Sequence, residues 1–199
     1  MADEMYMGFK YRGIRYRCAD NWFSVIPVDR TKPIQYLEIG AFHGLNTSSV
    51  GVSYAAHPDS RMHVIDPWEQ YSEYPEYDNE KLNEAFENFK YNISINNLSN
   101  KTIVHRGYSN EILLTLPDNS FDMIYIDGNH EPEYVLEDAV LAFRKLKVDG
   151  YMIFDDYGWA GPDLTQRGID AFISSYYKRI KHLNNGNHIQ TQMFIQKTS

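Results

Sequence analysis

The chain has 199 residues with 43% hydrophobic and 23% charged side chains, which is the size and composition of a single globular domain. A formal net charge of −8 argues against nucleic acid or an anionic membrane surface as a partner, and no apolar run is long enough for a membrane helix. The single cysteine, Cys18, excludes a disulfide framework, and the acidic N-terminus has no signal-peptide core, so we expect a cytoplasmic protein.

The N-terminal segment, residues 1–33, differs from the rest of the chain because it has no clear periodicity and scatters aromatic side chains among arginines and lysines. We interpret it as an N-terminal arm or lid over the core. From residue 34 to residue 199, short apolar runs alternate with helical patterns, which predicts one α/β domain.

A tight glycine turn follows the first apolar run, residues 34–39, and leads into a helical pattern over residues 45–57. Gly40 permits the turn, and we expect Gly44 to let strand and helix approach closely. The backbone amides of such a turn face outward and suit a polar or anionic ligand. A dinucleotide fold would require a glycine at position 42, where this chain has Phe42, so a pyrophosphate ligand and an NAD oxidoreductase are disfavoured.

Glu38 stands two residues before the first glycine of the turn. A carboxylate in a buried strand is costly unless it is paired or hydrogen-bonded. An acidic residue followed by G-x-x-x-G resembles the first motif of the class I S-adenosylmethionine (SAM) methyltransferases; an ordinary turn with glycines placed for packing is the alternative. The resemblance implies cofactor contacts from Glu38, Gly40, Ala41, Phe42, Gly44 and Asn46.

A second apolar strand over residues 62–66 ends in Asp66. Because the carboxyl ends of parallel strands lie beside one another, we expect Asp66 next to the glycine turn, where it can accept both hydrogen bonds from a ribose diol. The methyltransferase family uses its second motif in this way. The acidic, tyrosine-rich stretch over residues 68–79 then interrupts the alternation of strands and helices. It is either a substrate lid or a solvated loop. A helix is predicted after it, over residues 80–96.

A third strand over residues 101–105 and a short helix over residues 110–116 enclose another turn. In the methyltransferases this turn lies against the adenine ring of the cofactor. Gly107 and Ser109 match the small or polar residues found there, and the ring of Tyr108 is placed to stack on the base.

The remaining pattern, from residue 121 to residue 195, predicts the last strands and helices of the sheet. Strands are predicted over residues 121–127 and 151–156, helices over 131–146 and 163–178, and closing strands over 180–183 and 191–195 with a hairpin turn at 184–187. The prediction is an α/β, Rossmann-like, doubly wound, mostly parallel seven-stranded sheet with helices on both faces and an antiparallel C-terminal strand, which suits the class I methyltransferase fold.

Three carboxylates end adjacent predicted strands: Asp127 follows the fourth strand, and Asp155 and Asp156 follow the fifth. Like charges gathered in one crevice repel, so we expect a cation to hold them together. Oxygen ligands in a partly open site suit a hard divalent cation such as Mg²⁺ or Ca²⁺. The alternative is one structural acid beside two solvated ones.

The stretches I-D-G-N-H-E-P-E-Y and D-G-Y-M-I-F-D-D-Y carry a closer resemblance. They are similar to a family of metal-dependent O-methyltransferases (methyltransferase 24-like) that includes macrocin- and novobiocin-type sugar enzymes and, more distantly, catechol O-methyltransferase. The resemblance covers about residues 34–157 and implies a methyltransferase domain over residues 34–199. It also implies Mg²⁺ ligands at Asp127, Asp155 and Asp156, with Asp127 serving the cofactor and catalysis as well.

His130 lies three residues past Asp127, where catechol-type enzymes place a lysine base, and we expect it to be the general base. The sugar-modifying relatives have an acid one position earlier, where this chain has Asn129. A helix cap or a solvated histidine is the alternative.

The leading function is therefore a SAM- and Mg²⁺-dependent O-methyltransferase acting on a vicinal diol of a sugar, in a glycan or a glycoside. A catechol or phenol acceptor and a non-catalytic SAM-binding domain are the alternatives. A small-molecule or glycan acceptor with adjacent hydroxyls is the expected partner. The sequence leaves open a homodimer, and also a domain within a larger glycan-building protein.

Overall fold

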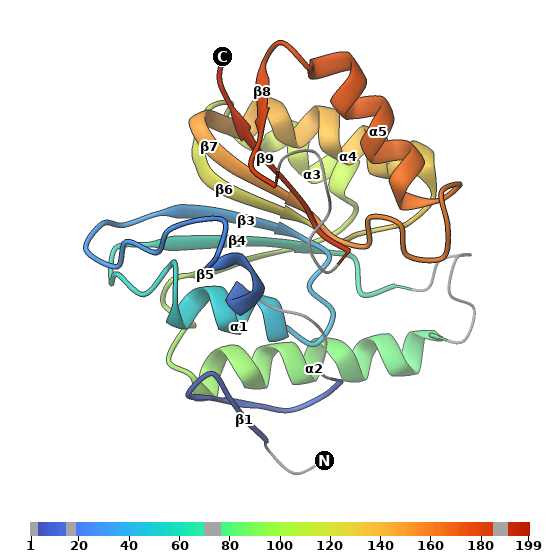
Figure 1. Ribbon diagram of the computed structural model, residues 1–199. Coiled ribbons are helices and arrows are strands. Elements are labelled where there is room, and N and C mark those ends of the chain that lie inside the picture. The colour runs from blue at the N-terminus through green and yellow to red at the C-terminus, as the bar shows by residue number, and fades with distance from the viewer. Residues whose placement is uncertain (1–3, 15–18, 70–76, 185–190) are drawn as a thin grey trace.

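The structure is a computed structural model, and it describes residues 4–14, 19–69, 77–184 and 191–199. A seven-stranded sheet in the order β5-β4-β3-β6-β7-β9-β8 forms its centre (Figure 1). The strands are β3 (Gln35–Ile39), β4 (Arg61–Asp66), β5 (Thr102–Arg106), β6 (Phe121–Ile126), β7 (Leu146–Phe154), β8 (Ile180–His182) and β9 (Met193–Lys197). The first five strands in this order, β5, β4, β3, β6 and β7, pair in parallel, and β9 runs antiparallel to both of its neighbours, β7 and β8.

Helices cover both faces of this sheet (Figure 1). They are α1 (Leu45–Val52), α2 (Asn79–Ile95), α3 (Ser109–Thr115), α4 (Pro132–Lys145) and α5 (Thr165–Tyr176). The first two lie on one face, and the other three pack on the opposite face. The predicted fold class, a doubly wound α/β sheet with an antiparallel C-terminal strand, is confirmed. Among the described helices, none combines the length and the apolar character needed to cross a membrane.

The central strands are buried on both faces, which explains their nearly continuous apolar sequences. In β3, Leu37 faces the core beneath α4 and α5, whereas Tyr36 faces the core beneath α1 and α2. The first helix ends at Val52, five residues earlier than its pattern predicts. Beyond it, the chain turns, and the carbonyl oxygen of Ala55 accepts a hydrogen bond from the Lys101 ammonium group at 2.8 Å.

The described parts of the N-terminal segment form a hairpin of β1 (Glu4–Tyr6) and β2 (Phe9–Tyr11) and a short 3-10 helix η1 (Ala19–Trp22). The hairpin is tied to α2, because the Asn96 side chain exchanges hydrogen bonds with the backbone of Lys10 at 3.0 and 2.7 Å. Whether this segment acts as a lid stays a prediction. Residues 70–76 of the proposed acidic lid and residues 185–187 of the predicted hairpin turn lie outside the described residues.

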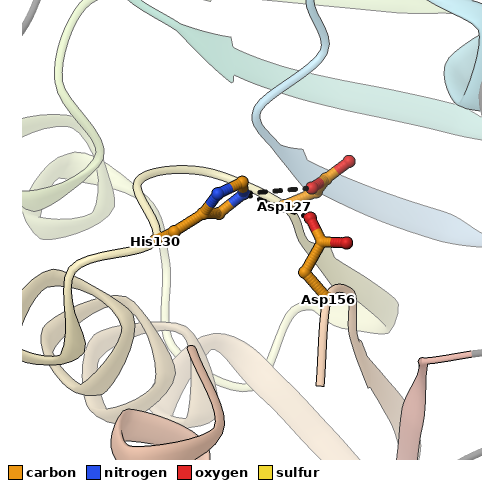
Figure 2. Close-up of side chains that lie close together, drawn as sticks. All are labelled: Asp127, His130 and Asp156. Atoms are coloured by element: carbon orange, nitrogen blue, oxygen red, sulfur yellow. Dashed lines mark ion pairs between the residues drawn. The ribbon is translucent and has the colours of Figure 1, made fainter. Parts of the chain in front are cut away.

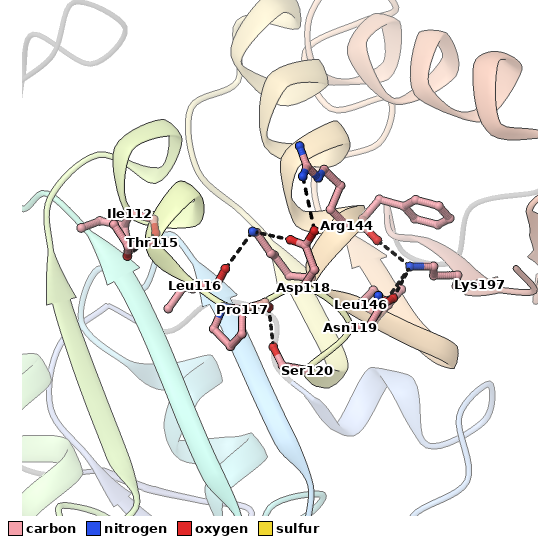
Figure 3. A network of polar contacts seen from close by, with 12 residues as sticks. Ile112, Thr115, Leu116, Pro117, Asp118, Asn119, Ser120, Arg144, Leu146 and Lys197 are labelled. Atoms are coloured by element: carbon pink, nitrogen blue, oxygen red, sulfur yellow. Dashed lines mark hydrogen bonds and ion pairs between the residues drawn. The ribbon is translucent and has the colours of Figure 1, made fainter.

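A network of polar contacts surrounds the loop before the amino end of β6 (Figure 3). The acids Asp127, Asp155 and Asp156 lie at the opposite, carboxyl ends of β6 and β7. The ammonium group of Lys145 donates to the Leu116 carbonyl at 2.8 Å and to the Asp118 carboxylate at 2.6 Å. The ammonium group of Lys197, on β9, donates to the Leu146 carbonyl at 2.7 Å and to the Asn119 side chain at 3.2 Å. These two buried lysines hold the loop before β6 against the last helical turn of α4.

Candidate active site

The carboxyl ends of the parallel strands open into one cleft with a volume of about 1110 Å³. Most of the residues proposed from the sequence line it. They are Glu38, Gly40, Ala41, Phe42, Asn46, Asp66, Tyr108, Ser109, Asp127, His130, Asp155 and Asp156. Gly44 and Gly107 belong to the same turns but are not among the lining residues.

The glycine turn after β3 is shaped by close contacts that exclude side chains. Gly40 has φ +81°, and a Cβ at this position would collide with the Asp127 carbonyl oxygen at the end of β6. Gly44 has φ +80°, and a Cβ there would lie 2.7 Å from the ring of Phe89 in α2. At Gly44 the close approach is therefore between the turn and α2, which packs across it. The positive φ of Gly44 is a second reason for a glycine at this position.

Asp66 lies beside this turn, as its place at the end of β4 predicts. Its Oδ2 accepts hydrogen bonds from the backbone amides of Ala41 and Phe42, both at 2.9 Å. Its Oδ1 accepts the amide of Trp68 at 2.7 Å. Burial raises the pKa of the Asp66 carboxyl, and the amides of the turn oppose that shift. A carboxylate has about four acceptor positions, and three of them are used by these amides. The role of Asp66 toward a ribose diol stays a prediction.

Glu38 is the buried acid of β3, with 1% of its surface exposed. Its Oε2 accepts hydrogen bonds from the Tyr36 hydroxyl at 3.0 Å and from the Thr47 hydroxyl at 2.9 Å. The Asn46 amide in turn donates to the Tyr36 hydroxyl at 3.0 Å. Burial raises the pKa of Glu38 to about 8, and the hydrogen bonds from Thr47 and Tyr36 oppose that shift. Glu38 thus has the hydrogen-bonded surroundings that a buried acid requires.

The acid cluster lies at the ends of β6 and β7 (Figure 2). His130 Nε2 lies 3.2 Å from Asp156 Oδ2 and 4.0 Å from Asp127 Oδ1. One ligand atom from each of these three residues falls within 4.8 Å of the others, which is a spacing that a metal ion could bridge. Burial, followed by repulsion from Asp155, raises the pKa of Asp127 to about 7. Asp156 has φ +54°, an unfavourable conformation for a residue with a side chain, as often found at functional sites.

Asp155, the third proposed metal ligand, lies next to this cluster with its oxygens engaged elsewhere. Its Oδ2 accepts a hydrogen bond from the Tyr125 hydroxyl at 2.5 Å, and its Oδ1 accepts the backbone amide of Asp156 at 2.9 Å. One ligand atom from each of Asp127, His130 and Asp156 forms the close group, and Asp155 lines the same cleft next to them.

Some residues of the cleft escaped the sequence analysis as site residues, among them Tyr134, Asp138 and Trp159. Tyr11, Trp68 and Tyr77 also line it, and they belong to the segments that the sequence predicts as an arm or lid and as a substrate lid or loop. Trp159 is 42% exposed, and its ring meets the His130 ring edge-on at 5.4 Å. No periodicity marks it, because it lies in a loop. Asp138 is 3% exposed, and burial raises its pKa to about 7. Helical spacing places Asp138 beside Val135 and Ala139 on the buried face of α4, so an acid on that face was a readable signal.

The parallel sheet with its reversed last strand, the glycine turn after β3 and the acid at the end of β4 are together the features of the class I methyltransferase fold. A family model described as "Methyltransferase domain" matches residues 37–157, more than half of the chain. The chain belongs to this methyltransferase-domain family, and it is a SAM-dependent methyltransferase.

Solved structures of low sequence identity share the fold. The O-methyltransferase TomG from Streptomyces achromogenes, involved in tomaymycin synthesis and solved with SAM, has a TM-score of 0.61 and 19% identity over 83% of this chain and 73% of its own. An O-methyltransferase from Bacillus cereus, solved with SAH, has a TM-score of 0.56 and 19% identity over 82% of this chain and 74% of its own.

One curated relative is a protein of Acanthamoeba polyphaga mimivirus named uncharacterized protein R132. It is 36% identical over 77 residues, which are 36% of this chain and 34% of that protein. The match therefore spans about a third of the relative's length.

Proposed function

We propose that this methyltransferase transfers the methyl group to a hydroxyl of a vicinal diol in a sugar, either a glycan or a glycoside, with the help of Mg²⁺ or another hard divalent cation. The observation that carries the proposal is the meeting of the glycine turn and the acid cluster of Asp127, His130 and Asp156 in one cleft. At about 1110 Å³ the cleft exceeds the roughly 300–1,000 Å³ usual for one ligand, so it has room for cofactor and acceptor together.

The cofactor side of the cleft is the turn after β3 with the neighbouring ends of β4 and β5. SAM supplies an activated methyl group on a positively charged sulfur when it is bound. We assign its contacts to the turn residues Gly40 to Phe42, with Glu38 and Asn46 behind the turn and Asp66 beside it. Tyr108 and Ser109 would face the base, because they line the same cleft at the start of α3.

The acid cluster fits a hard cation by its chemistry. Asp127 and Asp156 present carboxylate oxygens within bridging distance, and after burial, repulsion from Asp155 is the next largest cause of the raised pKa of Asp127. These two residues, joined by Asp155, would hold the ion. A bound divalent cation would lower the pKa of an acceptor hydroxyl and hold two adjacent oxygens in a fixed geometry.

His130 is the proposed general base, and its Nε2 would take the proton of the acceptor hydroxyl. Once protonated, this nitrogen faces the Asp156 carboxylate at 3.2 Å, so the positive charge is stabilised where it forms. The Trp159 ring restrains the imidazole by its edge-on contact. The side chain of His130 is 13% exposed, which leaves it open to the cleft while most of its surface is shielded from water.

We also propose that the N-terminal arm helps to close the cleft. Tyr11, at the end of β2, lines the cleft and supports this role. The Tyr11 hydroxyl donates to the Ile14 carbonyl at 2.8 Å, which fixes the ring against the arm's own backbone. We therefore keep residues 1–33 as a proposed lid on this side of the site.

A catechol or another phenol is the second candidate acceptor, and the aromatic lining favours it. Trp159, Tyr134 and Tyr77 all border the cleft, and an exposed Trp159 ring next to the proposed base would stack on a flat acceptor as well as on the apolar face of a sugar. A non-catalytic SAM-binding domain is the third candidate, but it gives no reason for carboxylates that repel one another beside a histidine.

The test is methyl transfer from SAM labelled in its methyl group to matched acceptors. The panel pairs each glycoside that carries a vicinal diol with its deoxy analogue lacking one hydroxyl, and pairs catechol with phenol. We expect transfer to the diol glycosides that EDTA stops and added Mg²⁺ restores. Transfer that persists in EDTA would contradict the cation role, a preference for catechol would replace the sugar acceptor, and SAM binding without any transfer would favour the non-catalytic domain.

A further inference from the structure

Tyr125 is a core tyrosine with a hydroxyl group at the edge of the acid cluster. It lies on β6 with 1% of its surface exposed, and it is not among the residues that line the cleft. Its ring packs against the ring of Trp22 at 5.2 Å, within the core beneath α1 and α2. A hydroxyl in such surroundings is costly to bury without a hydrogen-bond partner, so the partners it has are informative.

Those partners are two of the proposed cation ligands. The Tyr125 hydroxyl lies 2.5 Å from Asp155 Oδ2 and 3.2 Å from Asp127 Oδ2. A phenol has one proton to donate, so the shorter contact identifies Asp155 as its main acceptor. The Asp156 amide holds the other Asp155 oxygen at 2.9 Å. Asp155 is therefore held from two sides, by groups that are themselves fixed in the core and in the backbone.

We propose that Tyr125 is a positioning residue of the divalent-cation site, and that its buried hydroxyl holds Asp155 in the orientation that completes the ligand set with Asp127 and Asp156. This inference rests on the proposed function, since it assigns a role toward the same cation. The hydroxyl lies within reach of both carboxylates and offsets their repulsion, so its removal should let Asp155 and Asp127 move apart. Outer partners of metal ligands typically contribute about 10–100-fold to metal affinity.

The test is a titration of the full chain with Mn²⁺, in which binding is measured from the electron paramagnetic resonance signal of the free ion. Tyr125→Phe removes only the hydroxyl and keeps the ring in the core. We expect its dissociation constant for Mn²⁺ to rise about 10–100-fold, whereas SAM affinity measured by calorimetry stays at the wild-type value.

Tyr54→Phe is the matched control. Tyr54 is also a buried tyrosine whose ring packs on Trp22, at 5.9 Å, but its hydroxyl donates to the Ile26 carbonyl at 2.8 Å, away from the acids. We expect its Mn²⁺ affinity to equal that of the wild type. An equal loss of affinity in both variants would assign the effect to general loosening of the core, and it would overturn the positioning role.

A double-mutant cycle separates positioning from any other effect of Tyr125. If the hydroxyl acts through Asp155, Tyr125→Phe should change Mn²⁺ affinity by less than about twofold in an Asp155→Ala background. Wild-type affinity in the single Tyr125→Phe variant, or the full loss repeated in the Asp155→Ala background, would overturn the inference.

Failure of the inference is distinct from failure of the proposed function. If the wild-type chain binds SAM but no Mn²⁺, the cation role in the proposed function falls, and the positioning role falls with it. If the wild type binds Mn²⁺ and Tyr125→Phe binds it equally well, only the role of Tyr125 is removed.

Discussion

Charged groups at the two ends of β6 have opposite surroundings: the lysines at the amino end are buried, and the acids at the carboxyl end are half-buried. At the amino end, the ammonium groups of Lys145 and Lys197 each meet several oxygens, including a carboxylate 2.6 Å from Lys145 (Figure 3). At the carboxyl end, Asp127 and Asp156 lie close together beside His130 (Figure 2). Asp155 adds a further negative charge that repels Asp127. One end is electrostatically complete, and the other is short of positive charge.

The contrast separates charge used for stability from charge used for function. A buried charge whose hydrogen bonds are all satisfied holds a loop in place, and its loss is felt in the free energy of unfolding. Carboxylates that repel one another in a cleft are costly to the fold, and such groups mark sites where a ligand completes the electrostatics. The predictions below test this division at each end.

The largest effect is expected for Asp127→Ala at the carboxyl end. Removing this carboxylate takes one proposed ligand from the cation, so turnover should fall by more than the about 10²–10⁴-fold expected for loss of a proton-transfer group. SAM should still bind. The measurement is labelled methyl transfer with and without Mg²⁺, beside calorimetry with SAM.

Asp118→Ala at the amino end is the control for this comparison, because it removes an acid of the same type from the same strand's other end. Its kcat should match the wild type. Magnesium-stimulated turnover by Asp127→Ala at the wild-type rate would end the assignment of Asp127 as a ligand.

His130→Ala should lower kcat by about 10²–10⁴-fold, because the acceptor proton then has no positioned base. The affinity for SAM should not change. His57→Ala serves as control, since His57 follows α1 and does not line the cleft. Steady-state kinetics with saturating SAM measure both variants, and a kcat for His130→Ala near that of the wild type would remove this residue from the mechanism.

Lys145→Met should act on stability and leave kcat unchanged. The variant keeps the length of the side chain but removes the donor to Leu116 and Asp118, so unfolding should require about 1–3 kcal/mol less. Arg144→Met is the matched control, because Arg144 contacts the same Asp118 carboxylate at 3.3 Å from a side chain that is 62% exposed. It should cost no more than about 1 kcal/mol. Urea denaturation distinguishes the two, and equal losses would contradict the special role of the buried lysine.

Much of the fold was predictable because its signals are local. The apolar run before Gly40 and the alternation of strands and helices are patterns within short windows, and they correctly predicted the doubly wound sheet. The rule that parallel strands end at one edge also placed Asp66, Asp127 and Asp156 in the same cleft. Helix ends were less predictable, since the end of α1 at Val52 coincides with a contact to Lys101, a residue far along the chain.

The sequence by itself determined that helices cover both faces of a mostly parallel sheet, and that the acids gather at the carboxyl ends of its strands. Periodicity and strand ends determine these features, and both depend on neighbours along the chain. Only the tertiary structure decided how the acids are turned: Asp66 toward the amides of the glycine turn, and Asp155 toward Tyr125. It also brought Trp159 and Tyr11 to the cleft. The direction of a side chain depends on partners from other strands and loops, and no local pattern records those partners.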